Sequence, residues 1–184
     1  MGVVGVDIGL KGAIAYIDGY GAATTWTMPV MGTHSKPIDY DPYNMSLVVR
    51  YLLHMDVTWV IEKPIRNPKS GWRAVAQSHM CAGIWRGLLK DQSIIWVHPR
   101  TWQSKILKGL PGETTKERSI HFARCVYPDV DLTPGRLKKP HDGIADAICI
   151  ARWWLQYGLT AVEPSNSAKP TKDSTTAGLP PTHV

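Results

Sequence analysis

The sequence contains little cysteine and none of the features that direct a chain to a membrane. Its 184 residues include three cysteines, an odd number, and no Cys-x-x-Cys pair or His/Cys set with zinc-ligand spacing. A disulfide framework and a zinc site are therefore not expected, and a reduced cytoplasmic setting fits best. No apolar run reaches about 18 residues, and no basic segment precedes an apolar one at the N-terminus, so no membrane span or signal peptide is predicted.

Acidic residues are absent from one long stretch in a chain whose net charge is +6. Residues 63–90 contain no aspartate or glutamate but six basic residues, namely Lys63, Arg66, Lys69, Arg73, Arg86 and Lys90. Aromatic side chains are interleaved with the basic ones, namely Trp72, Trp85, Trp96, His98 and Trp102. A solvated surface would have the same composition, but we interpret the pattern as a basic stripe for phosphate contact.

The order of apolar segments predicts one α/β domain over residues 1–160. Three short strands with glycine-bearing turns indicate an antiparallel meander, at residues 3–7, 13–17 and 22–28. Two further strands are expected at 57–64 and 94–99, and helices at 43–55, 72–90, 100–107, 114–126 and 142–157. Together they predict a five-stranded mixed sheet, three antiparallel strands plus two parallel, flanked by helices. Residues 161–184, rich in proline, serine and threonine, are expected to form a disordered tail.

Two carboxylates stand at the ends of apolar strands, where an ionised group is unfavourable without a cation. Asp7 ends the segment VVGVD, and Glu62 follows VTWVI. Each also has a simpler interpretation. Asp7 could form a turn beside Gly9, and Glu62 could pair with Lys63 or an arginine.

Two more carboxylates, Asp142 and Asp146, begin the last predicted helix. Four residues correspond to ~1.1 turns and ~6 Å of rise, so both side chains share one face and repel each other. Asp142 could be only the N-cap of the helix, whereas Asp146 lies inside an apolar run.

A pair of divalent cations would account for all four carboxylates. Mg²⁺ prefers hard oxygen ligands and keeps several waters, so a few carboxylates suffice. Two such ions can activate a water and stabilise the leaving oxygen of a phosphodiester. We therefore predict two Mg²⁺ ions per active site, with catalytic and metal-binding residues Asp7, Glu62, Asp142 and Asp146.

Three motifs in order resemble those of the RuvC-like Holliday junction resolvases, namely GVDIG, VIEKP and HDGIADAICIA. The third is closer to bacteriophage and prophage versions, which points to a bacterial or phage-infected cell. The resemblance covers residues 2–157. It implies a ribonuclease H-like fold and a homodimer that nicks two strands symmetrically at a four-way DNA junction, with Mg²⁺ or Mn²⁺. It also implies that the same four carboxylates are the metal ligands.

The last motif departs from the family pattern. The family usually spaces its final acidic pair three apart, whereas here position 143 is glycine and the partner of Asp146 is Asp142. His141 beside it could assist or replace Asp142 as a ligand, although a histidine there is more often a surface or capping residue.

Two further segments resemble family regions. SGWRAVAQSHMCAGIWRGLL resembles the helix of the dimer interface, with Ala74, Ala76, Ala82 and Gly83 allowing close approach, and an ordinary buried helix is the alternative. HPRTWQSKILKG and TTKERS resemble the stretch whose lysines meet DNA. We predict DNA contacts from Lys105, Lys108, Lys116, Lys138, Lys139, Arg66, Lys69 and Arg73, each of which could instead be a surface cation.

Three other functions share some of these features. A ribonuclease H-like nuclease could act on RNA–DNA hybrids or other branched DNA. A non-catalytic junction-binding module could use the acidic residues only to organise its fold. GVDIG followed by a hairpin also opens actin-like and sugar-kinase domains, but 184 residues are too few for their two lobes.

Overall fold

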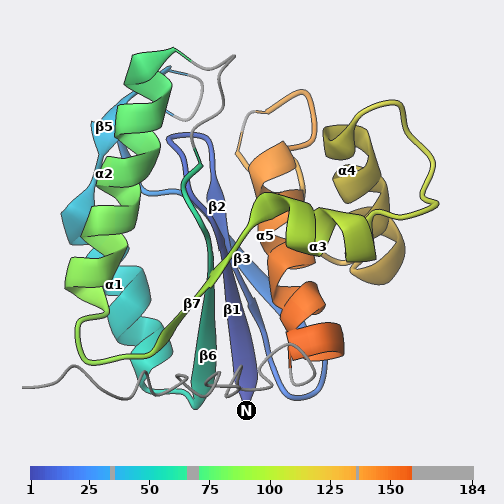
Figure 1. The fold of residues 1–184 in the computed structure, drawn as a ribbon, viewed down its shortest axis with the longest axis horizontal. Coiled ribbons are helices and arrows are strands. Elements are labelled where there is room, and N and C mark those ends of the chain that lie inside the picture. Colours follow the sequence, from blue (N-terminus) through green and yellow to red (C-terminus); the bar gives the residue numbers. More distant parts are fainter. Residues whose placement is uncertain (34–35, 66–70, 136, 159–184) are drawn as a thin grey trace, which may run out of the picture.

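The structure is a computed structural model that describes residues 1–33, 36–65, 71–135 and 137–158. A five-stranded sheet forms the middle layer, with helices on both faces (Figure 1). The predicted tail at 161–184 lies outside the described residues, as do Arg66 and Lys69. None of the described helices has both the length and the apolar character needed to cross a bilayer.

The strand order of the sheet is β3 (Ala23–Thr27), β2 (Ala13–Ile17), β1 (Gly2–Asp7), β6 (Val57–Glu62) and β7 (Ile94–Val97). The first three strands pair antiparallel, and β1, β6 and β7 pair parallel. The predicted five-stranded mixed sheet is thereby confirmed. Since β1 and β6 run parallel in the centre, their carboxyl ends meet at the same edge of the sheet.

A second sheet was not predicted. It pairs β4 (Val30–Thr33) with β5 (Lys36–Tyr40), and its register shifts between Met31 and Gly32. Glycine and proline are depleted in strands. Because Gly32 and Pro37 lie in these two segments, the sequence pattern does not predict a hairpin here. The Tyr40 hydroxyl donates to the Gln77 carbonyl at 3.2 Å, which ties the hairpin to the neighbouring helix.

The helices divide between the two faces of the sheet (Figure 1). One face carries α1 (Pro42–Leu53) and α2 (Trp72–Leu88), and the other carries α3 (Pro99–Ile106), α4 (Thr115–Val126) and α5 (Asp142–Trp153). The helix predicted to run to residue 157 ends at Trp153, and Trp154–Gly158 form a π-helical turn. The other helices begin and end within two residues of the predicted bounds.

Alternation along the central strands assigns each side chain to one face. On β1, Val4 and Val6 pack in the core with α1 and α2, whereas Val3 packs in the core with α5. On β6, Ile61 belongs to the first core and Val60 to the second. Because the period of a strand is two, Asp7 and Glu62 both extend toward the face covered by α5.

Close contact between α5 and β1 sets the height of the helix above the sheet. A β-carbon added at Gly5 would overlap the Ala147 carbonyl and lie 2.6 Å from the Ala151 nitrogen. One added at Gly143 would overlap the Lys11 carbonyl and lie 2.9 Å from the Gly12 α-carbon. Glycine at both positions lets the start of α5 rest against the end of β1 and the turn after it.

Candidate active site

The strand ends and the start of α5 bring together the four predicted carboxylates, called here the acid cluster: Asp7, Glu62, Asp142 and Asp146. Asp7 is the last residue of β1 and Glu62 the last of β6. Val6 lies opposite Ile61 in the parallel register, so the next residues end side by side. All four side chains are partly exposed, while Ala145 and Ala147 beside Asp146 are fully buried.

The pKa of Asp7 responds to its burial and to the charges of the other three carboxylates. Burial raises the pKa of Asp7 well above its ordinary value, and the charges of Glu62, Asp146 and Asp142 raise it further. Three carboxylates acting on a fourth at the edge of a sheet create a strongly negative site. Such a site favours binding of either protons or cations.

Burial is also the first cause of the shifts at Glu62 and Asp146. It raises the pKa of Glu62 to about 7, with a further rise from the charge of Asp146 and opposition from a hydrogen bond. That bond comes from the indole N–H of Trp102 on α3, at 2.9 Å. Burial raises the pKa of Asp146 to about 6, against the effect of the Ser119 hydroxyl.

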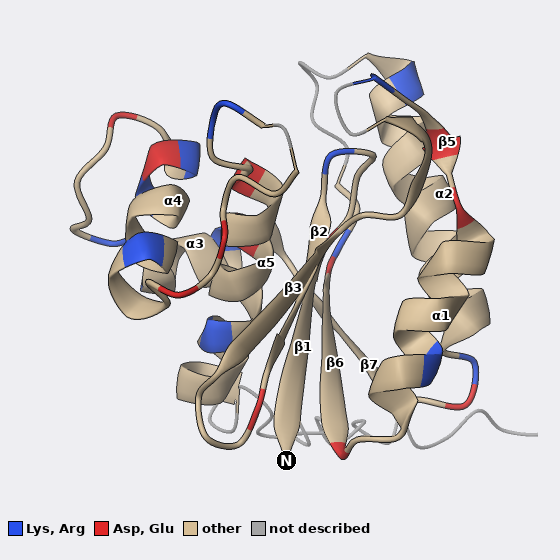
Figure 2. Cartoon of the chain, turned by 180° about the vertical axis from the view of Figure 1, so that it is seen from behind, with Lys and Arg blue, Asp and Glu red and all other residues tan. Residues whose placement is uncertain are grey.

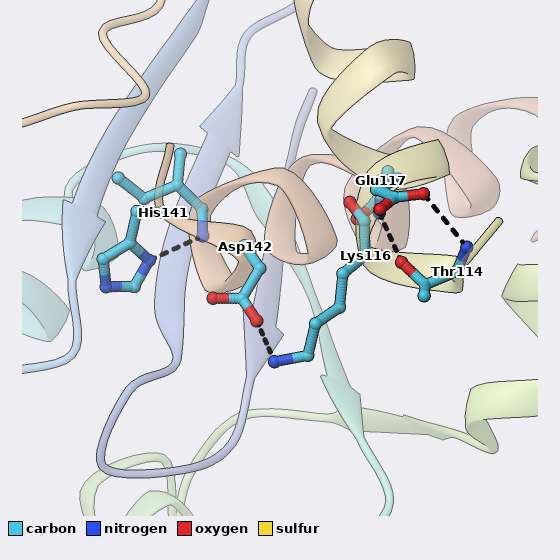
Figure 3. Close-up of polar contacts among 7 residues, drawn as sticks. Thr114, Lys116, Glu117, His141 and Asp142 are labelled. Atoms are coloured by element: carbon cyan, nitrogen blue, oxygen red, sulfur yellow. Dashed lines mark hydrogen bonds and ion pairs between the residues drawn. The ribbon is translucent and has the colours of Figure 1, made fainter. Parts of the chain in front are cut away.

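Asp142 differs from the other three because it has a cationic partner. Lys116, in the first turn of α4, forms an ion pair with its carboxylate (Figure 3). Burial would raise the pKa of Asp142, but the hydrogen bond and charge of Lys116 outweigh it and lower the pKa. The same hydrogen bond raises the pKa of Lys116. The predicted DNA-binding lysine is thus the counter-ion of the cluster.

Asp142 is not the N-cap of α5, which corrects the simpler interpretation of this residue. The cap is His141, whose Nδ1 accepts a hydrogen bond from the Ile144 backbone N–H at 3.2 Å (Figure 3). A cap must precede the first helical residue, and Asp142 is that residue. Because Nδ1 of His141 is engaged in the cap, that nitrogen is not available as a metal ligand while the cap holds.

Two residues that interact with acid-cluster carboxylates, Ser119 and Trp102, were not predicted to do so. Ser119 on α4 is the fully buried polar side chain of the described core, and its hydroxyl bonds to the Lys116 carbonyl at 3.0 Å and acts on Asp146. Nothing in the sequence marks this serine. Trp102 offered one signal, since the N–H of a buried tryptophan needs an acceptor.

Two of the aromatic residues that supported the predicted basic stripe are not at the surface. Trp85 and Trp102 are buried in the cores on opposite faces of the sheet. Trp96 is covered by Arg86, whose guanidinium carbon lies 4.6 Å from the ring centroid. Trp72, at the start of α2, is 81% exposed. Packing in the cores therefore explains Trp85 and Trp102, whereas Trp72 and His98 are exposed.

The other predicted DNA-binding cations lie at several places around the cluster. Lys105 and Lys108 are exposed at the end of α3, and Lys138 and Lys139 are exposed in the loop before α5. Basic segments on α3 and α4 lie on the same side of the sheet as α5 (Figure 2). Arg73 is exposed in the first turn of α2, on the opposite face. Arg66 and Lys69 lie outside the described residues.

The donor chemistry of the acid cluster fits a divalent cation, but its side chains are not gathered around one point. Across residues 1–33, 36–65, 71–135 and 137–158, no three His, Cys, Asp or Glu side chains are placed to hold a metal ion. Lys116 holds the Asp142 carboxylate in an ion pair, and Trp102 holds Glu62 by a hydrogen bond. Side-chain rotation within the cluster would therefore have to accompany metal binding.

Comparisons with known proteins reveal similarity of fold. No protein-family model and no curated protein matches the sequence. Similar solved structures include "T. thermophilus RuvC in complex with Holliday junction substrate", at 17% identity over 88% of this chain and 96% of that chain, with a TM-score of 0.55. A second Thermus thermophilus RuvC structure has 18% identity over 88% and 97%, with a TM-score of 0.49. At this level of identity the likeness establishes the fold alone, which is the predicted ribonuclease H-like one.

Proposed function

We propose that the protein is a structure-selective endonuclease that resolves four-way DNA junctions. The observation that carries this proposal is the placement of Asp7 and Glu62 at the carboxyl ends of β1 and β6, with Asp142 and Asp146 at the start of the helix that packs on β1. The likeness of the fold to a RuvC described as bound to a Holliday junction supports the choice of substrate.

The acid cluster would hold two Mg²⁺ ions, with Mn²⁺ able to substitute. When bound, such ions activate a water and stabilise the leaving oxygen of a phosphodiester. Trp102 holds Glu62 and Ser119 acts on Asp146, so two of the carboxylates are oriented from α3 and α4. Lys116, once released from Asp142, can offset negative charge at the scissile phosphate.

A homodimer would place two such sites on one junction, and the exposed face of α2 supports it. Ala76, Gly83 and Gly87 are exposed, and open space surrounds both glycines. Two large apolar side chains, Trp72 and Met80, are exposed on the same helix. Small residues let helices approach closely, and a two-fold dimer matches the paired symmetric nicks we propose.

The test is strand nicking of a synthetic mobile four-way junction, mapped to the nucleotide, with Mg²⁺ or with EDTA. We expect paired symmetric nicks that require the metal. Asp7→Asn and Glu62→Gln should reduce nicking by about 100-fold or more and leave junction binding in place. Glu113→Gln, the same change at an exposed glutamate, is the control.

Wild-type nicking by Asp7→Asn, or nicking in EDTA, would rule out this assignment. A Y-fork and an RNA–DNA hybrid in parallel reactions distinguish junction resolution from other ribonuclease H-like activities. Binding of the junction without any nicking would instead identify a non-catalytic module.

A further inference from the structure

A groove of about 420 Å³ lies between α3 and α4, outside the acid cluster. It is lined by Leu107 and by six polar or basic residues, namely Arg100, Gln103, Ser104, Lys108, Thr115 and Arg118. No acidic residue lines it. Of these residues, only Lys108 was predicted to meet DNA.

Helix periodicity explains why polar residues line the groove from both sides. On α3, residues 100, 103, 104 and 107 follow the i, i+3, i+4, i+7 pattern and share one face. The opposite face carries Trp102 and Ile106, which are buried in the core. Residues 115 and 118 likewise share one face of the first turn of α4. The polar faces of the two helices therefore border the same groove.

The positive charge of the groove is not neutralised within the described part of the chain. None of the ion pairs there involves Arg100, Lys108 or Arg118. The nearby Glu117 carboxylate accepts hydrogen bonds from the backbone N–H groups of Glu113 and Thr114, at 2.7 and 3.3 Å. Three cations without a carboxylate partner around one groove favour an anionic ligand.

One of the cations is held in place before any ligand arrives. The Nε of Arg118 donates to the Gly112 carbonyl at 2.9 Å, and this bond leaves the terminal nitrogens of the guanidinium for a ligand. A guanidinium restrained in this way loses less conformational entropy when it binds a phosphate.

The helices that border the groove also supply the partners of two acid-cluster carboxylates. Lys116, which pairs with Asp142, lies in the same turn of α4 as Thr115 and Arg118. Trp102, which bonds to Glu62, lies on α3 between Arg100 and Gln103. The two helices thus present one face to the acid cluster and another to the groove, and a polymer can contact both.

We propose that this groove binds the phosphodiester backbone of the nucleic-acid strand that passes the acid cluster. The inference rests on the proposed function for the nature of the polymer. Arg100, Lys108 and Arg118 supply the charge, and the hydroxyl and amide side chains supply further donors to phosphate oxygens. Such contacts position a strand without reading its sequence.

The experiment compares two triple variants with the same change in net charge. Arg100→Gln/Lys108→Gln/Arg118→Gln alters the groove, and Lys36→Gln/Arg50→Gln/Arg124→Gln alters exposed cations elsewhere. Binding of a labelled four-way junction is measured without divalent cation over a range of salt. We expect the groove variant to bind about tenfold or more weakly than the control, and its salt slope to fall by about 2–3. A plain duplex should show the same loss.

Equal affinities and slopes for the two variants would overturn the proposal, because net charge alone would then account for any loss. Thermal unfolding checks each variant, and Arg100→Gln/Lys108→Gln, which retains the Arg118 bond, gives a second reading if the triple variant unfolds. Binding that depends on the groove, without nicking, would sink the proposed function and leave the groove intact. If the protein nicks the junction but the groove variant binds it as the control does, the proposed function holds and the groove proposal is wrong. A chain that binds no nucleic acid overturns both.

Discussion

The four carboxylates of the acid cluster differ in charge state because their partners differ. Asp142 has Lys116 beside it and a lowered pKa, whereas burial and repulsion raise the pKa of Asp7, Glu62 and Asp146. The raised groups make the metal-free site a source of instability near neutral pH. Sites built for cations often have this property, since the cation removes the repulsion.

The free energy of unfolding in EDTA should therefore fall as pH rises from 5 to 8. In the folded chain burial brings the pKa of Glu62 to about 7 and that of Asp146 to about 6. The unfolded values are near 4, so these groups add stability at low pH that is lost as pH rises through 6 and 7. The pKa of Asp142 is lowered in the folded chain, so this residue makes the free energy of unfolding depend on pH only below about pH 4.

Glu62→Gln tests this expectation at one residue. The amide oxygen can still accept from Trp102, but it carries no charge to bury. We expect the variant to be more stable than wild type by roughly 1–3 kcal/mol at pH 8 in EDTA, and nearly equal at pH 5. Urea titrations measure the difference, and Glu113→Gln should follow wild type throughout. If the free energy of unfolding of Glu62→Gln changes with pH from 5 to 8 as that of wild type does, the buried charge of Glu62 does not destabilise the protein.

At the scale of elements, the contact of α5 with β1 determines where the last acidic pair can stand. Gly143 faces the turn at Lys11 and Gly12 without room for a β-carbon. A carboxylate at 143, as the usual three-residue spacing requires, would clash with that backbone. The acidic residue one position earlier reaches the cluster from the first position of the helix. Position 143 therefore has no room for an acidic side chain.

Gly143→Ala should destabilise the protein even though alanine is the better helix former. The added β-carbon must push α5 away from the turn, and overpacking of this kind costs about 1–3 kcal/mol. Gly87→Ala on α2 meets nothing within 4 Å in the single subunit and should instead add up to about 1 kcal/mol at protein concentrations too low for the proposed dimer. Opposite shifts in urea midpoint are the expected result. If both variants are stabilised, α5 does not rest on the turn as described.

At the scale of the whole molecule, the exposed face of α2 is where a second copy would bind. A face with small residues next to exposed Trp72 and Met80 is unusual for a helix facing only solvent. Ala82, predicted to help at the interface, is buried toward the sheet and is not part of this face.

Gly83→Glu should convert a dimer into a monomer because it adds bulk and charge to the centre of that face. Sedimentation velocity measures the change, with Tyr43→Glu on the exposed surface of α1 as the control. The control should remain a dimer. In the α2 variant the Kd of the dimer should rise by about tenfold or more. A wild-type chain that sediments as a monomer at micromolar concentration would contradict the predicted assembly.

Local sequence was sufficient to predict most of the elements and to place Asp7 and Glu62 at the ends of their strands. Strand period, helix period and the anomaly of Asp7 and Glu62 at apolar strand ends depend on neighbours a few residues away. Only the tertiary structure decided that Lys116 neutralises Asp142, that Trp102 and Ser119 support the other carboxylates, and that His141 caps α5. It also revealed the β4–β5 hairpin and the burial of Trp85. The physical reason is that the protonation and partners of a side chain depend on what packs against it, and those groups come from segments far apart in the chain.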